Sequence, residues 1–283
     1  MDAPQTLCGG LTVGESPRWH DGRLWLSNWG AGEVLALDGH GHLEVKAKSP
    51  VPVPFCIDWL PDGRLLVVAG AEARLLRQEA DGSLVTHTDL SGLAKGWNEI
   101  VVDGRGNIYV NGSDYDFMGG GPFIPGVVAL ITPDGAVRQV ADGIEFGNGM
   151  AVTPDNSTLI VTESFGHRLT AFDIASDGSL SNRRVWAELE SSADGICLDA
   201  EGAVWAASVH ECVRVRQGGE ILDRVGVGED RFCFACMLGG PDGRTLFILT
   251  AAWYGVERLG EVFAAHTGQV LTARTRSPHA GRP

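Results

Sequence analysis

The chain has 283 residues and a net charge of −14; 44% of its residues are hydrophobic and 20% are charged. This composition is ordinary for a globular protein, and the acidic balance excludes the basic patches of a nucleic-acid-binding surface. No window contains the roughly 18 uninterrupted apolar residues of a membrane span, and the N-terminus lacks the basic and apolar regions of a signal peptide. We expect one domain over residues 1–283, cytoplasmic because its cysteines are sparse, with no membrane or obligate protein partner.

A turn of the Pro-Asp-Gly type followed by an alternating apolar strand recurs six times along the chain. In chain order the copies are WHDGRLWLSN (19–28), LPDGRLLVVAG (60–70), DGRGNIYVNG (103–112), TPDNSTLIVTES (153–164), DAEGAVWAAS (199–208) and GPDGRTLFILTA (240–251). A period of about 40 to 50 residues built from short strands is typical of a propeller, so we predict an all-β, six-bladed β-propeller.

Two segments depart from the repeat. The longest interval between copies contains SDYDFMGGGPFIPG (113–126), a Gly-rich insertion that a blade does not need and that we expect to be a functional loop. The polar sequence from about residue 273 is expected to be frayed. No stretch shows a sustained helical pattern, so we expect no long helix.

Polar residues occupy one fixed place in the repeat, six or seven residues before each turn. The six residues at this place are Glu15, Cys56, Asn98, Asn148, Asp194 and Ala235. Because the first strand of each propeller blade lines the central channel, equivalent positions of different blades converge on the axis. Four of the six carry oxygen donors suited to a hard divalent cation. The alternative is that Asn and Asp beside Gly are turn residues; four such residues in phase with the repeat favour the metal site.

The segments GESPRW, WNEIVVDGRGNIYV, FGNGMAVTPDNSTLIVTES, ADGICLDAEGAVWAA and FACMLGGPDGRTLFI resemble the senescence marker protein / gluconolactonase / luciferin-regenerating enzyme-like family over residues 10 to 265. The resemblance implies a six-bladed propeller with one catalytic divalent metal and hydrolytic activity, often on sugar lactones. It places the metal ligands at Glu15, Asn148 and Asp194, and an Asn that faces both substrate and metal at Asn98.

The chain departs from the animal gluconolactonases near this last residue. Gly96 replaces the Arg that holds sugar hydroxyls, and Glu99 replaces an Asp. An acidic residue of the following loop corresponds only loosely to Asp116. We expect Asn98, Trp97, Glu99 and Asp116 to contact the substrate, with Trp97 favouring a more apolar molecule.

His210 follows the strand AVWAAS, where a loop would reach the mouth of the channel. It is a candidate substrate-binding residue and a candidate acid or base, with an ordinary surface histidine as the alternative.

The predicted function is that of a divalent-metal-dependent hydrolase of the gluconolactonase type, which opens a lactone by attack on a metal-polarised carbonyl group. Asp194 is the catalytic residue, as general base or, less favoured, as nucleophile. Calcium is the favoured ion, with manganese, magnesium and zinc as alternatives. Rival functions are the hydrolysis of aryl esters or phosphotriesters, and metal or ligand binding without catalysis. The absence of GxSxG, GxGxxG and P-loop motifs leaves serine-hydrolase and nucleotide functions without support.

Overall fold

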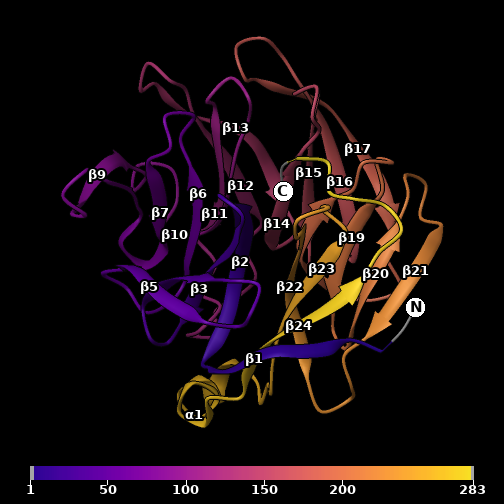
Figure 1. The fold of residues 1–283 in the computed structure, drawn as a ribbon. Helices are drawn as coiled ribbons and strands as arrows, with labels where there is room; N and C mark the ends of the chain where they lie inside the picture. The colour runs from indigo at the N-terminus through magenta and orange to yellow at the C-terminus, as the bar shows by residue number, and fades with distance from the viewer. Residues whose placement is uncertain (1–2, 282–283) are drawn as a thin grey trace.

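The computed structural model describes residues 3–281, which form six four-stranded antiparallel sheets arranged as the blades of a propeller (Figure 1). The prediction of an all-β, six-bladed propeller is confirmed. The first strands of adjacent blades contact one another in an unbroken ring, β2, β6, β10, β14, β18 and β22, and therefore surround the axis. The repeated turn of the sequence joins the first strand of each blade to the second.

The strand bounds of the first three blades are β2 (Val13–His20), β3 (Arg23–Trp29), β4 (Glu33–Leu37) and β5 (Leu43–Lys48); β6 (Phe55–Trp59), β7 (Leu65–Ala69), β8 (Arg74–Gln78) and β9 (Leu84–Asp89); and β10 (Gly96–Val102), β11 (Ile108–Ser113), β12 (Gly126–Ile131) and β13 (Val137–Ile144). The next two are β14 (Gly147–Val152), β15 (Thr158–Glu163), β16 (Arg168–Ile174) and β17 (Leu180–Glu188); and β18 (Ala193–Leu198), β19 (Val204–Ser208), β20 (Glu211–Val215) and β21 (Ile221–Gly226).

The sixth blade is built from both ends of the chain. It contains β22 (Phe232–Gly239), β23 (Thr245–Ala251) and β24 (Gly268–Arg274), and its outer edge is β1 (Gln5–Leu11), which pairs with β24. Figure 1 shows these two strands side by side, β1 in indigo and β24 in yellow. This pairing closes the ring and holds the first and last strands together.

The expectation of a frayed tail is wrong for the described residues up to 281. After β24 the chain returns across blades five and six, where the backbone N–H groups of Thr275, His279 and Ala280 donate to the carbonyls of Arg244, Gly243 and Leu198. Ser277 is buried. Backbone hydrogen bonds of this kind do not depend on apolar side chains, so the polar composition of the tail did not reveal them.

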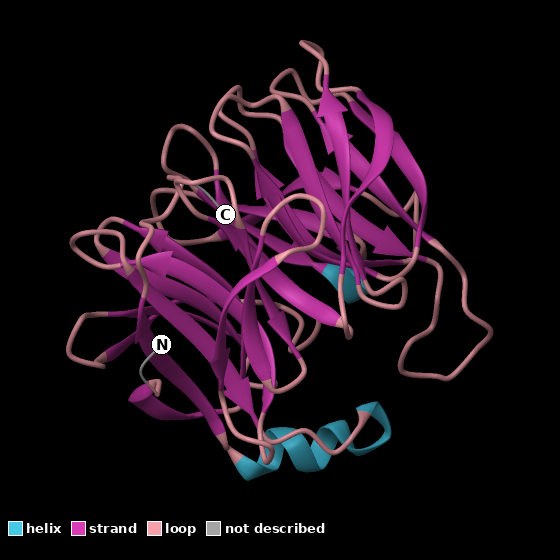
Figure 2. Cartoon of the chain, turned by 90° about the vertical axis from the view of Figure 1, so that its right-hand side faces the viewer, coloured by secondary structure: helices cyan, strands magenta, loops and turns pink. Residues whose placement is uncertain are grey.

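In the described part of the chain, helical structure is confined to short connections at one end of the blades: η1 (Gly70–Glu72), η2 (Val256–Arg258) and α1 (Leu259–Ala265) (Figure 2). The sequence did not predict α1, because seven residues are too few for a helical pattern to stand out. Within residues 3–281, no helix has the length and apolarity needed to span a membrane.

Burial decreases from the axis outward. All of β7 (LLVVA) is buried, whereas β5 (LEVKAK) at the edge of its blade has no buried residue. Hydrophobic clusters fill the spaces between neighbouring blades, for example the cluster that joins Val68 of the second blade to Ile100 and Val110 of the third. The blades are thus held together by packing between sheets, and the axis is left for polar side chains.

Gly70 provides a test of the close packing between blades two and three. A Cβ atom at Gly70 would lie 1.9 Å from the backbone oxygen of Trp97 and 2.8 Å from Cγ of Pro54. We predict that Gly70→Ala lowers the free energy of unfolding by about 1–3 kcal/mol, the range for overpacking. The matched control is Gly39→Ala, where a Cβ meets nothing within 4 Å and the expected change is below about 0.5 kcal/mol. Equal urea midpoints for the two variants would contradict this packing.

Candidate functional site

The four predicted oxygen donors all lie near the start of an inner strand, at a bulge in its pairing with the second strand. Asn98, Asn148 and Asp194 each lie in a segment where two residues oppose one, and Glu15 directly precedes such a segment. The second blade, which has Cys56 at the equivalent place, pairs without a bulge. A bulge re-aims the side chains that it contains, so these four irregularities turn the donors relative to a regular strand.

The glycines after two of the donors allow adjacent inner strands to approach closely. A Cβ at Gly149 would lie 2.7 Å from the carbonyl oxygen of Asp194, and a Cβ at Gly195 would lie 2.5 Å from Cβ of Ala235. Both glycines are in strands, not turns. The Asn-Gly and Asp-Gly pairs are therefore explained by close contact between blades four, five and six, and the turn alternative is excluded for them.

Two of the donors are in direct contact. Nδ2 of Asn98 donates to Oδ1 of Asn148 over 3.3 Å and to the carbonyl oxygen of Gly147 over 3.4 Å. Nδ2 of Asn111, on the neighbouring strand β11, donates to the carbonyl oxygen of Asn148 over 2.6 Å. These bonds fix the amide groups of blades three and four relative to each other.

The two carboxylates, Glu15 and Asp194, are held in a setting that disfavours their charge. Burial, followed by the charges of Asp194 and Glu99, raises the pKa of the Glu15 carboxyl group well above its ordinary value. Burial and the charge of Glu99 likewise raise the pKa of Asp194. Oδ1 of Asp194 is buried without a hydrogen-bond partner, and the carboxylate of Glu15 accepts a bond from the backbone N–H of Ser16. A buried carboxylate in this state requires a proton or a cation.

The donor set fits a hard divalent ion. Within residues 3–281, no group of three or more His, Cys, Asp or Glu side chains is arranged to hold a metal. A centre here would therefore combine the carboxylates of Glu15 and Asp194 with the amide oxygens of Asn98 and Asn148. Two carboxylates with amide carbonyls are the ligands that calcium takes in proteins.

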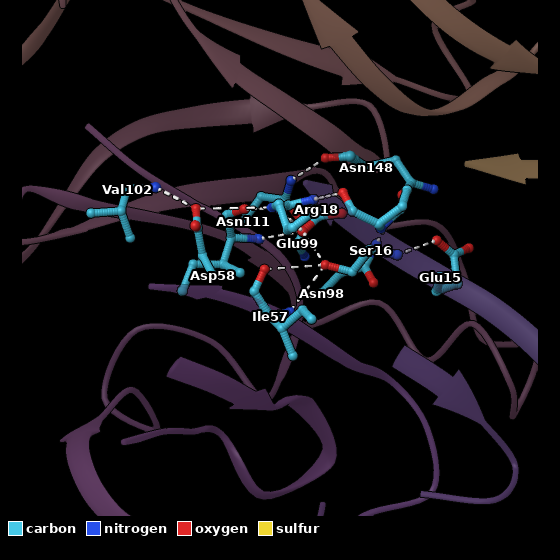
Figure 3. Close-up of polar contacts among 12 residues, drawn as sticks. Glu15, Ser16, Arg18, Ile57, Asp58, Asn98, Glu99, Val102, Asn111 and Asn148 are labelled. Atoms are coloured by element: carbon cyan, nitrogen blue, oxygen red, sulfur yellow. Dashed lines mark hydrogen bonds and ion pairs between the residues drawn. The ribbon is translucent and has the colours of Figure 1, made fainter. Parts of the chain in front are cut away.

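A second charged network lies deeper along the axis and contains a cation of its own, Arg18 (Figure 3). Nη2 of Arg18 donates to Oε1 of Glu99 over 3.0 Å and to the carbonyl oxygen of Ile100 over 2.7 Å. The hydroxyl of Ser16 donates to the same Oε1 over 3.2 Å. Asp58 accepts from the backbone N–H of Val102 over 2.8 Å and lies 4.0 Å from Nε of Arg18. The single positive charge of Arg18 is thus shared between Glu99 and Asp58.

The structure corrects two of the predicted substrate contacts. Trp97 is only 1% exposed and packs in the hydrophobic cluster between blades two and three, with Nε1 donating to the carbonyl oxygen of Ala94. Glu99 is buried and bonded to Arg18 and Ser16. Neither side chain is available to a substrate, because one belongs to the core and the other to the axial network.

The remaining predicted residues lie on loops. Asp116 is exposed and accepts a bond from the N–H of Gly119 in its own loop, the predicted insertion between β11 and β12. His210 is exposed, with Nδ1 2.6 Å from the carbonyl oxygen of Arg231. Their contact with substrate stays a prediction.

Sequence reasoning missed the residues that support the donors. Arg18, Ser16 and Asn111 were not singled out, although each is a polar residue inside a buried strand. A charged or amide side chain in such a strand must find a buried partner, and this signal could have identified Arg18 and Asn111.

A cavity of about 250 Å³ opens at the far ends of the inner strands, lined by residues that include Arg18, Asp58, Trp59 and His279. None of the four donors lines it. The cavity has an internally compensated arginine, whereas the donor end has carboxylates without a cation, so the chemistry of the side chains points to the donor end.

Comparison with known proteins settles the family. The model for the SMP-30/Gluconolactonase/LRE-like region matches residues 13–252, which is most of the chain. The chain belongs to this family. The family resemblance predicted from sequence is therefore confirmed, and a gluconolactonase-like hydrolase is the activity that this membership suggests.

Similarity to individual curated family members is partial. The chain is 31% identical to regucalcin of Danio rerio over 134 residues, 45% of each chain, and 29% identical to regucalcin of Xenopus laevis over 133 residues, 44% of each chain. The match thus spans less than half the length of these relatives.

Solved family structures share the whole fold. A luciferin-regenerating enzyme superposes with a TM-score of 0.80 and 20% identity, covering 96% of this chain and 94% of that one. A calcium-binding regucalcin from Agrobacterium tumefaciens gives 0.79 and 19%, with 99% and 96% covered. A gluconolactonase from Xanthomonas campestris gives 0.75 and 20%, with 100% and 96% covered. At this level of identity the likeness establishes the six-bladed architecture.

The axial network predicts a dependence of stability on pH. Burial raises the pKa of Asp58 to about 6, against the opposing effect of Arg18, while Glu99 adds a smaller rise. The folded state therefore binds a proton more tightly than the unfolded state between about pH 4 and pH 6. The free energy of unfolding should fall by about 1–3 kcal/mol through this group as the pH rises across that window. Urea unfolding of wild type and Asp58→Asn at several pH values isolates the effect; parallel pH profiles would contradict it.

Proposed function

We propose that this protein is a divalent-metal-dependent hydrolase that opens a lactone ring. The observation that carries the proposal is the pair of carboxylates at the amides of Asn98 and Asn148, with Glu15 buried and Asp194 partly buried. Within residues 3–281 neither carboxylate is paired with a basic side chain, and the pKa values of both are raised. Membership in a family with gluconolactonases among its named members supports a lactone as substrate. Opposite the donors, Arg18 is already committed to Glu99 and Asp58 and cannot serve as counter-ion.

Glu15, Asn98, Asn148 and Asp194 would hold the ion. Calcium is the first choice because all four donors are oxygens, and the Agrobacterium regucalcin of the same fold is described as calcium-binding. Manganese, magnesium and zinc remain alternatives. When bound, the ion would polarise the lactone carbonyl group and make a water molecule more acidic.

Asp194 is the proposed general base. No hydrogen-bond donor contacts its Oδ1, so this oxygen is free to accept a proton from the attacking water. Water adds to the acyl carbon, the ring C–O bond breaks, and Asp194 returns the proton of the water to the ring oxygen, which gives a hydroxy acid. Asn98 and Asn148, fixed by their mutual bond, orient the reacting groups.

A small molecule is thus the proposed partner, and the low cysteine density supports a cytoplasmic location. The calcium-binding neighbour also supports a second candidate, a metal-binding propeller without catalysis. A panel of lactones, aryl esters and phosphotriesters, assayed with several metals and with chelator, separates the two candidates. Hydrolysis that needs metal identifies an enzyme, and the preferred substrate class identifies its chemistry.

Two conservative substitutions separate the proposed roles of the carboxylates. Asp194→Asn keeps an oxygen ligand but removes the base, so kcat at saturating metal should fall by about 100-fold or more. Glu15→Gln should weaken metal binding in calorimetry yet regain turnover at saturating metal, because Glu15 transfers no proton. Full recovery of Asp194→Asn at saturating metal would show that Asp194 is a ligand only, and Asp116 and His210 would then be the next candidates for the base.

A further inference from the structure

Five aromatic rings from three loops form one cluster, here named the aromatic rim: Tyr115, Phe117, Phe123, Phe146 and Phe165. The rings of Phe146 and Phe165 stack with centroids 4.5 Å apart, and those of Phe117 and Phe146 are 4.9 Å apart. Phe123 joins the cluster through Phe165 at 5.3 Å and Tyr115 at 5.4 Å. The loop predicted to be functional thus contributes three of the five rings.

The rim lies at the donor end of the propeller. Pairing of Gly96 with Ser113 and of Gly147 with Glu163 places the loops after β11 and β15 beside the starts of the inner strands. Phe146 directly precedes Gly147, whose carbonyl oxygen accepts the bond from Asn98, and is two residues from Asn148. The aromatic surface is therefore continuous with the candidate metal centre through blades three and four.

Much of this aromatic surface is exposed. Phe165 is 44% and Phe123 is 41% exposed, and Met118 and Ile124 of the same loop are 51% and 42% exposed. Of the ten large hydrophobic side chains exposed within residues 3–281, these four are in two adjoining loops. Grouped apolar exposure beside a candidate active site marks a binding surface.

We propose that the aromatic rim binds an apolar substituent of the substrate, so that the lactone carries an alkyl or aryl group rather than several hydroxyl groups. This inference rests on the proposed function and deepens it. Stacked and edge-on rings offer dispersion contacts and release water from apolar surface, but they offer few hydrogen bonds for sugar hydroxyls. Ring opening at the donor set is unchanged, and the rim selects which lactone reaches it.

Three lactones with the same six-membered ring test the proposal: δ-valerolactone without a side chain, δ-decalactone with a pentyl chain, and polyhydroxylated glucono-δ-lactone. We expect kcat/KM for δ-decalactone to exceed that for each of the other two by about tenfold or more. The double variant Phe123→Ala/Phe165→Ala should lower the ratio of δ-decalactone to δ-valerolactone about tenfold. Val185→Ala is the control, since Val185 is 51% exposed on the outer strand β17, and it should leave the ratio unchanged.

A binding measurement separates failure of the rim from failure of the catalytic proposal. The pentyl lactam analogue of δ-decalactone resists hydrolysis, and the double variant should bind it about tenfold more weakly in calorimetry. If no lactone is hydrolysed with any metal but the double variant binds the lactam more weakly, the proposed lactonase function is wrong and the proposed role of the rim is supported. A preference for glucono-δ-lactone would overturn the proposed role of the rim. An unchanged ratio of δ-decalactone to δ-valerolactone in the double variant would also overturn it. So does a wild-type dimer that the double variant dissociates in sedimentation, because the rim would then join two copies.

Discussion

The rest of the site depends on one physical constraint: the carboxyl groups of Glu15 and Asp194 are both held close to the axis of the propeller. Both carboxyl groups are held where burial and neighbouring negative charge raise their pKa values. The buried cation on the same inner strand as Glu15, Arg18, is occupied deeper along the axis by Glu99 and Asp58. Within residues 3–281 the arrangement thus has one layer of carboxylates that share a cation and one layer in which neither carboxylate is paired with a basic side chain, and the second layer has the electrostatic character of a cation site.

The fold delivers this arrangement through local departures from regular strand geometry. Each donor blade has a bulge at its donor. Of the two blades without an oxygen donor at this place, the one with Cys56 pairs regularly and the one with Ala235 is also irregular. Gly149 and Gly195 then let neighbouring inner strands approach until backbone atoms touch. Pairing of β1 with β24 closes the ring, so donors from blades that are distant in sequence are held at fixed positions around it.

The sequence predicted the architecture because the architecture is encoded in a repeat, and the same repeat is the basis on which the donors are proposed. Six turns with a constant period specify six blades, and a polar residue at one phase of the repeat specifies an inward-facing position. The sequence did not predict the direction in which each side chain points. Trp97 and Asn98 are neighbours in the sequence, yet the ring of Trp97 packs between blades two and three, whereas the side chain of Asn98 faces Asn148. A bulge decides which way Glu99 then points, and no local pattern revealed the bulge or the partner, Arg18, 81 residues away. The tail and the ring closure rest on backbone hydrogen bonds between distant segments, which leave little trace in composition.

The most direct measurement of the central claim is a crystal structure of the protein soaked with manganese, with data collected at a wavelength where this ion scatters anomalously. The account predicts one strong anomalous peak on the axis, bonded at about 2.0–2.6 Å to oxygens of Glu15, Asn148 and Asp194 and facing Asn98. A peak confined to exposed acidic loops, or a donor set left without a peak at saturating manganese, would contradict it.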